Sequence, residues 1–213
     1  MTIRIFQPNS QIAISQSRRV ERLFQQSKIP QNAALVVIDM QKGFDDQKWG
    51  NRNNPDLSRN VEILLQAWRD SNRPIIHIQH CSVELGSVLR PELESCDFYP
   101  SVKPIDGEII FQKNVNSCFT GTDLEIYCTE NQIDTLIIVG ISSDHCVSTS
   151  TRLAANLGFV TYLVNDATCT FDRVDPFTKE IYPAELVHRV HLASLNNEFA
   201  KVINTKSVLE LLE

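Results

Sequence analysis

The chain has 213 residues, and its 26 acidic and 20 basic side chains give a formal net charge of −6. With 42% hydrophobic and 22% charged residues, the composition is typical of a globular protein and excludes a disordered chain, a collagen-like repeat or a coiled-coil rod. The acidic balance argues against a nucleic-acid partner, and the lack of an apolar run near about 18 residues argues against a membrane partner.

The first 30 residues are set apart from the rest of the chain. Residues 15–26 have the spacing of a helix, so we predict an N-terminal helical extension over residues 1–30 and a single domain over residues 31–213. The N-terminus carries no apolar segment of signal-peptide length, and we therefore expect a cytoplasmic location.

Short apolar runs and longer amphipathic segments alternate through the rest of the chain. The apolar runs predict strands over residues 33–38, 74–79, 108–113, 135–140, 159–164 and 201–204. The segments with helical spacing predict helices over residues 56–70, 121–131, 145–157 and 183–199. This repeated alternation predicts an α/β fold, with a parallel sheet joined by right-handed crossovers.

Two long connections and the absence of a glycine-rich phosphate-binding motif reduce the classes of function that fit the sequence. Residues 80–107 and 171–183 show little periodicity, and loops of this length in a compact domain are usually functional. The 7 glycines form no G-x-G-x-x-G or G-x-x-x-x-G-K-[ST] segment, so a phosphate-binding loop is not predicted. A nicotinamide oxidoreductase is therefore disfavoured despite the α/β pattern, and we expect no cofactor.

The 6 cysteines predict free thiols rather than a disulfide or zinc framework. No two of them form a C-x-x-C pair, and a chain of this size in a reducing compartment does not need disulfides. Each is by default a small buried apolar residue. They are Cys81, Cys96, Cys118, Cys128, Cys146 and Cys169.

Three reactive side chains lie at the ends of predicted strands. Asp39 directly follows the first strand, Lys113 ends the third, and Cys146 follows the fourth and starts a helical segment. Because ligands bind at the carboxyl edge of a parallel sheet, we expect these groups to meet there. The lysine and the helix N-terminus would lower the pKa of the thiol, and the carboxylate would accept its proton. Taken singly, the three have ordinary interpretations as a turn residue, a solvated side chain and a core thiol.

Three segments resemble the motifs of the isochorismatase-like cysteine hydrolases, a family related to nicotinamidase, N-carbamoylsarcosine amidase and ureidoacrylate amidohydrolase. The first is ALVVIDMQKGF (34–44), with the pattern D-x-Q-x-x-F. The second is FQKNVNSCFTGTDL (111–124), and the third is VGISSDHCVSTSTRLAANLGFVTYLVNDA (139–167). The resemblance covers about residues 33–205 and leaves only the N-terminal segment outside it.

The resemblance implies a three-layer α/β/α, Rossmann-like fold with a six-stranded parallel sheet, assembled as a homo-oligomer (dimer or tetramer). It implies a catalytic triad of Asp39, Lys113 and Cys146, in which Cys146 attacks a carbonyl carbon and forms a thioester. Asp39 would carry the thiol proton to the leaving nitrogen, while Lys113 holds Asp39 and stabilises the thiolate. A cis peptide at Ile141–Ser142 would direct the backbone N–H groups of Ser142 and Cys146 into an oxyanion hole.

Several other residues are candidates for contact with a small-molecule substrate. The predicted substrate-binding residues are Phe44, Trp49, His80, Phe119 and Phe171. Each also has an ordinary interpretation, as an aromatic residue of the core or surface or as a capping histidine. Arg90, in the long connection, is a candidate partner for a substrate carboxylate, with a solvated side chain as the alternative.

The chain departs from the metal-binding members of the family. Nicotinamidases bind a metal through an acidic residue and several histidines after the first motif, whereas residues 44–60 here contain no histidine. We therefore predict no metal, and we expect hydrolysis of a C–N bond in a small amide, ureide or carbamoyl compound. Two alternatives stay open: a non-catalytic binding protein on the same fold, and an isochorismatase-type vinyl-ether hydrolase, against which Cys146 argues.

Overall fold

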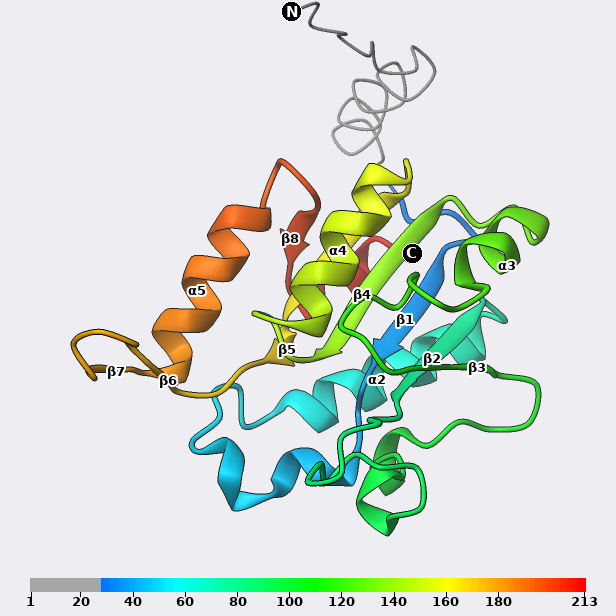
Figure 1. Ribbon diagram of the computed structural model, residues 1–213. Helices are drawn as coiled ribbons and strands as arrows, with labels where there is room; N and C mark the ends of the chain where they lie inside the picture. The colour runs from blue at the N-terminus through cyan, green and yellow to red at the C-terminus, as the bar shows by residue number, and fades with distance from the viewer. Residues whose placement is uncertain (1–27) are drawn as a thin grey trace, which may run out of the picture.

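A six-stranded parallel sheet forms the centre of the computed structural model, which describes residues 28–213 (Figure 1). Its strands are β1 (Ala34–Ile38), β2 (Ile75–His80), β3 (Ile109–Lys113), β4 (Thr135–Ile141), β5 (Val160–Cys169) and β8 (Lys201–Ile203). Their order across the sheet is β3-β2-β1-β4-β5-β8, and every neighbouring pair is parallel. The predicted strands and parallel sheet are therefore confirmed. The helix predicted over residues 15–26 lies outside the described residues.

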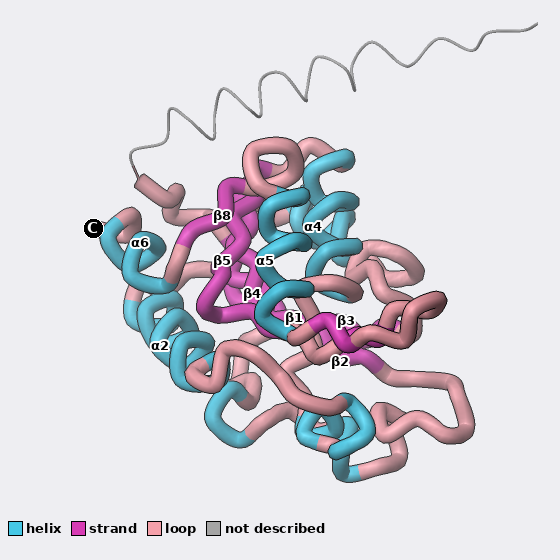
Figure 2. The backbone as a smooth tube through the Cα atoms, turned by 90° about the vertical axis from the view of Figure 1, so that its left-hand side faces the viewer, coloured by secondary structure: helices cyan, strands magenta, loops and turns pink. Residues whose placement is uncertain are grey.

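Helices cover both faces of the sheet and complete three layers (Figure 2). They are α2 (Leu57–Asp70), α3 (Leu124–Glu130), α4 (Cys146–Asn156), α5 (Ala184–Leu195) and α6 (Thr205–Glu210). On one face, Leu64 and Trp68 of α2 share a buried cluster with Val208 of α6. On the other, Val147 of α4 and Leu192 of α5 belong to a second cluster, to which α3 also contributes. The three-layer α/β/α fold is confirmed.

Short elements were not predicted. A small antiparallel hairpin, β6 (Arg173–Val174) with β7 (Ile181–Tyr182), lies within the segment expected to be a plain connection. The helix α6 was also missed, because six residues are too few to show a helical period. Its start is fixed by Asn204, whose side chain accepts a hydrogen bond from the Ser207 N–H at 2.8 Å.

The long connection between β2 and β3 contains no α-helix or strand, as its lack of periodicity predicted. It holds two 3-10 turns, Glu94–Cys96 and Pro100–Val102. Two further 3-10 turns, Lys42–Asp45 and Gln47–Trp49, follow β1. Both connections leave the carboxyl edge of the sheet, where Phe44, Trp49 and Leu89 contribute to the walls of the site described below.

None of the helices within residues 28–213 is long and apolar enough to cross a membrane. All six cysteines are free thiols, which confirms that prediction, and Cys81 is the only one of them that is not buried.

The chain changes its direction of travel across the sheet between β1 and β4. From β1 it builds outward through β2 and β3, and it then returns to β4 on the other side of β1. Gly140 of β4 lies opposite Ile38, and a Cβ at Gly140 would stand 2.0 Å from the Ile38 carbonyl oxygen. The two strands thus approach closely at the switch point, which is where open α/β sheets bind ligands.

We predict that Gly140→Ala lowers the free energy of unfolding by about 3 kcal/mol, because the new Cβ would collide with backbone and the φ of +119° disfavours any L side chain. Gly86→Ala is the matched control, since nothing lies within 4 Å of a Cβ there, and it should change stability by less than about 0.5 kcal/mol. Urea unfolding of both variants makes the comparison. Equal stability of the two would contradict the close contact between β1 and β4.

Candidate active site

Asp39 is the first residue after β1 and is fully buried at the carboxyl edge of the sheet. The strand stops at Ile38 because Asp39 adopts a left-handed conformation, with φ of 52°, which aspartate tolerates better than most residues. Its backbone N–H still donates to the Ile78 carbonyl of β2 at 3.0 Å. The carboxylate is therefore fixed at the end of a central strand.

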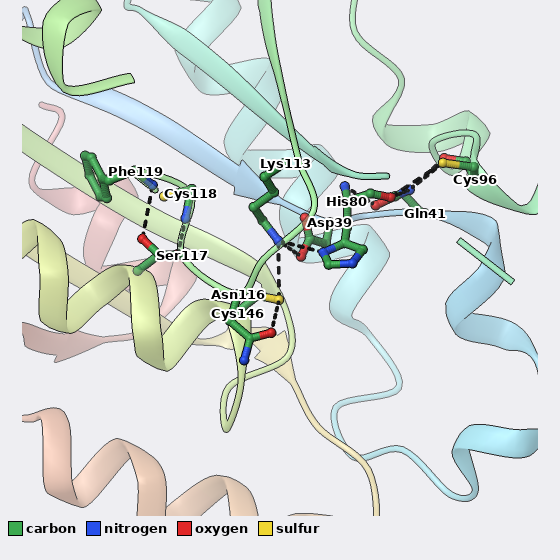
Figure 3. Close-up of polar contacts among 11 residues, drawn as sticks. Asp39, Gln41, His80, Cys96, Lys113, Asn116, Ser117, Cys118, Phe119 and Cys146 are labelled. Carbon is green, nitrogen blue, oxygen red and sulfur yellow. Dashed lines mark hydrogen bonds and ion pairs between the residues drawn. The ribbon is translucent and has the colours of Figure 1, made fainter. Parts of the chain in front are cut away.

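Lys113 ends β3 and pairs in register with His80, the last residue of β2. The N–H of Cys81 donates to the Lys113 carbonyl at 2.7 Å and extends this pairing by one residue. The side chain of Lys113 is fully buried and extends across β2 to Asp39 (Figure 3). The topology alone thus brings residues from three neighbouring strands together.

The Lys113 ammonium has three hydrogen-bond partners (Figure 3). Its Nζ lies 2.7 Å from Asp39 Oδ2, 3.2 Å from His80 Nδ1 and 3.3 Å from Cys146 Sγ. Burial lowers the pKa of Lys113, but the interactions of the ammonium with Asp39 and Cys146, the charge of Asp39 foremost, outweigh burial, and the pKa lies above its ordinary value. Lys113 is therefore charged, and the three groups expected to meet at this edge do so.

Cys146 is the first residue of α4, so its thiol lies at a helix N-terminus. Burial and the nearby Asp39 raise the pKa of this thiol, whereas Lys113 lowers it, and the net direction is upward. This corrects the expectation of an acidic thiol, because desolvation at a residue only 7% exposed outweighs the ammonium. Cys146 is therefore a thiol in the resting protein and needs a proton acceptor in order to attack.

The second carboxylate oxygen of Asp39 is free to accept a proton. Oδ1 is buried and has no hydrogen-bond partner among residues 28–213, while Oδ2 is bonded to Lys113. An Asp39 oxygen, a His80 nitrogen and the Cys146 sulfur lie within 4.8 Å of one another. Because an unpaired buried acceptor is costly, the transfer of the thiol proton to Oδ1 would satisfy it.

The turn between β4 and α4 contains a cis peptide at Ile141–Ser142, as the family resemblance implied. Within this turn, the N–H groups of His145 and Val147 both donate to the Ser142 carbonyl at 3.1 Å. The N–H groups of Ser142 and Cys146 make no such bond to the described part of the chain. These two backbone donors are therefore available to a ligand oxygen.

Gln41 of the first motif holds the end of β2 in place. Its fully buried amide accepts from the His80 N–H at 2.8 Å and donates to the His80 carbonyl at 3.0 Å. The same amide donates to the Cys96 carbonyl at 2.7 Å, which ties the long connection to the site. The Gln41 side chain thus satisfies both backbone hydrogen-bonding groups of His80, as a residue of a neighbouring strand would.

A cavity of about 130 Å³ opens beside Cys146. A cavity of about 150 Å³ is known to hold benzene, so this one has room for a similarly small group. Four of the predicted substrate contacts line it, namely Phe44, Trp49, His80 and Phe171. The rings of Phe44, Trp49 and Phe171 form one wall, with centroids 5.1, 5.6 and 6.2 Å apart.

The fifth predicted substrate contact, Phe119, does not line this cavity and lies in the core. Its ring is 9% exposed and stacks on Phe159 at a centroid distance of 5.7 Å, within the cluster that lies under α3 and α4. Figure 3 shows its ring well separated from Lys113 and Asp39. The motif shows that an aromatic residue follows the lysine, but not which side of the segment it occupies.

Sequence reasoning missed Arg173, a fixed cation in the cavity wall. Its Nε donates to Asp144 Oδ2 at 2.7 Å, and the Asp144 side chain is only 4% exposed. Burial raises the pKa of Asp144, but hydrogen bonds from Thr170, Arg173 and Ser142 outweigh it and hold that pKa below its ordinary value. Asp144 therefore stays ionised and anchors Arg173.

Asn116 was missed as well, although it stands only three residues after Lys113 in the second motif. It lines the cavity, and its Oδ1 lies 3.8 Å from Cys146 Sγ. Arg90, the basic residue that the sequence did suggest, forms an ion pair with Glu92 within the long connection. The only sequence signal for Asn116 is its proximity to Lys113 in the second motif.

The centre of the site offers ligand atoms for a cation, but a lysine already occupies it. Asp39, His80 and Cys146 each present one such atom. The Lys113 ammonium donates to all three, so a metal ion there would have to displace a buried, charged group. The arrangement fits proton transfer and nucleophilic attack by a thiol.

Comparison with known proteins agrees with this geometry. Residues 33–207 match the isochorismatase domain. The isochorismatase family protein YrdC of Bacillus subtilis (strain 168), itself uncharacterised, is 43% identical over 176 residues, covering 83% of this chain and 94% of the relative. The crystal structure of a hydrolase of this family from Chromobacterium violaceum matches with a TM-score of 0.83 and 38% identity, covering 86% of this chain and 94% of that one. N-carbamoylsarcosine amidase of Arthrobacter sp is 33% identical over 112 residues, covering 53% of this chain and 38% of the relative.

The chain belongs to the isochorismatase family, as its three motifs indicated, and it is a hydrolase of that family.

We predict that Lys113→Met lowers the free energy of unfolding by about 3–5 kcal/mol, because Asp39 then stays buried without a counter-charge. The double variant Asp39→Asn, Lys113→Met removes both charges and should regain most of this loss. Urea unfolding of the single and double variants measures the coupling. A Lys113→Met protein as stable as the native one would contradict a buried ion pair at this site.

Proposed function

We propose that the protein is a cysteine amidohydrolase that cleaves a C–N bond in a small amide, ureide or carbamoyl compound. The observation that carries the proposal is the buried contact set around Lys113, which joins the Asp39 carboxylate and the Cys146 thiol next to a cavity. A nucleophile, a proton acceptor and a cation within hydrogen-bond reach are the groups that acyl transfer requires.

In the first half of the reaction, Cys146 Sγ attacks the carbonyl carbon while its proton passes to Asp39 Oδ1. The carbonyl oxygen becomes an oxyanion, and the N–H groups of Ser142 and Cys146 stabilise it. Asp39 then gives its proton to the substrate nitrogen, the C–N bond breaks, and the amine leaves. The product on the enzyme is a thioester on Cys146.

In the second half, a water molecule takes the place of the amine. Asp39 accepts a proton from the water as it attacks the thioester carbon, and the same oxyanion hole stabilises the intermediate. The C–S bond breaks, the acid is released, and the proton on Asp39 returns to Cys146. Lys113 stays charged throughout, so that it balances Asp39 in the resting state and the thiolate during attack.

The cavity supports a small substrate with a flat portion and a polar end. The wall of three aromatic rings suits a planar amide or ureide group. Arg173, held by Asp144, supplies hydrogen-bond donors for an oxygen-bearing group such as a carboxylate. Similarity to N-carbamoylsarcosine amidase supports a substrate of this kind.

The proposal is tested by screening small amides, ureides and carbamoyl compounds, N-carbamoylsarcosine among them, for release of ammonia or amine. We predict that Cys146→Ala lowers kcat/KM for any active compound by at least about 10³-fold, because the nucleophile is lost. Cys128→Ala is the matched control, since Cys128 is buried on α3 away from the cavity, and it should keep nearly full activity. Turnover by Cys146→Ala at the native rate would overturn the proposal.

A further inference from the structure

The proposed reaction gives His80 no role, yet its ring is the third partner of the Lys113 ammonium. A lysine ammonium has three N–H donors and no acceptor. Asp39 Oδ2 and Cys146 Sγ take two of these donors, and His80 Nδ1 at 3.2 Å takes the third. Since the ammonium can only donate, Nδ1 must accept, and the hydrogen of the neutral ring is on Nε2.

The surroundings of His80 keep its ring neutral. Burial lowers the pKa of His80, and the Lys113 charge on β3 lowers it further. The carboxylates of Asp39, after β1, and Glu84, in the connection after β2, act in the opposite direction. Their effect is the smaller, so the pKa lies below its ordinary value and the ring is uncharged at neutral pH.

The backbone of His80 is fixed as firmly as that of a central strand. It pairs with Lys113 on one side, and on the other the Gln41 amide both donates to it and accepts from it. The ring also lines the cavity beside Cys146. Its position relative to the ammonium is therefore set by the fold and does not depend on a bound ligand.

We propose that His80 is a positioning residue for Lys113: by accepting the third ammonium hydrogen through Nδ1, it keeps the other two directed at Asp39 and Cys146. The inference rests on the proposed function only in that Cys146 is the nucleophile whose reactivity it controls. A protonated ring would present a donor and a positive charge to the ammonium. The reactivity of Cys146 then falls when His80 becomes charged as well as when its acceptor is removed.

The test measures the rate at which iodoacetamide alkylates Cys146 in the full-length protein. Peptide mass spectrometry monitors the modified cysteine, so no substrate is needed. In His80→Asn the amide oxygen takes the place of Nδ1 but does not titrate, and the rate at neutral pH should stay within about threefold of the native rate. His80→Leu removes the acceptor and should slow alkylation by about tenfold or more. His191→Asn, a histidine of α5 that does not line the cavity, should leave the rate unchanged.

The pH profile separates this role from a purely structural one. As the pH falls below the pKa of His80, the native rate should fall more steeply than the rate of His80→Asn, because only the native protein loses its acceptor. In the native protein, ¹⁵N NMR of the histidine rings should show His80 with Nδ1 unprotonated and Nε2 protonated.

Equal slowing in His80→Asn and His80→Leu, native reactivity in His80→Leu, or a hydrogen on Nδ1 would overturn the proposal. If His80→Leu does not fold, as judged by circular dichroism, the His80→Asn pH profile and the NMR tautomer decide the question. The outcome is distinguishable from a failure of the proposed function. If turnover depends on Cys146 but the His80 variants have no effect, only the positioning role fails. If the alkylation rates are as predicted but no amide is hydrolysed, only the hydrolase chemistry fails.

Discussion

The buried ammonium of Lys113 is the interaction on which the rest of the site depends. A carboxylate and a charged lysine that are both fully buried are tolerated only when each compensates the other and the remaining donors are bonded. Here Asp39 supplies the opposite charge, while His80 and Cys146 accept the other two hydrogens. The same contacts that make the charge tolerable place it between the Asp39 carboxylate and the Cys146 thiol, so the stability of the site and the chemistry we propose for it depend on one arrangement.

The order of the strands makes this arrangement possible. Asp39 follows β1, His80 ends β2 and Lys113 ends β3, and these three strands are neighbours. Cys146 comes from the other side of β1, because the chain returns to β4 at the switch point. The close approach at Gly140 draws β4 against β1, so that the turn carrying Cys146 starts beside Asp39.

The sequence predicted the fold well because buried parallel strands have short apolar sequences and the helices that cover them have amphipathic sequences. The strand ends also pointed to Asp39, Lys113 and Cys146, since topology places the ends of parallel strands along one edge. The sequence did not show which way a side chain beside a motif points, and it did not show helices shorter than about two turns. Phe119 is adjacent to a motif but faces the core, and α6 is too short for a period to appear.

Two other features were out of reach because they depend on side chains that meet only in three dimensions. Arg173 enters the cavity wall from a hairpin, held by Asp144 from the turn before α4. Burial raises the pKa of Cys146 by more than Lys113 lowers it, and burial at one residue cannot be deduced from spacing. In the mechanism we propose, the Cys146 thiol therefore needs Asp39 to accept its proton before it can attack.

The most direct test of this account is the mass of the protein during turnover. Acid quenching within milliseconds of mixing with an active amide, followed by intact-protein and peptide mass spectrometry, would capture the intermediate. The account predicts an added mass equal to the acyl group of the substrate, located on Cys146 and removed by hydroxylamine, as a thioester is. An acyl group found on a different residue during productive turnover would contradict it.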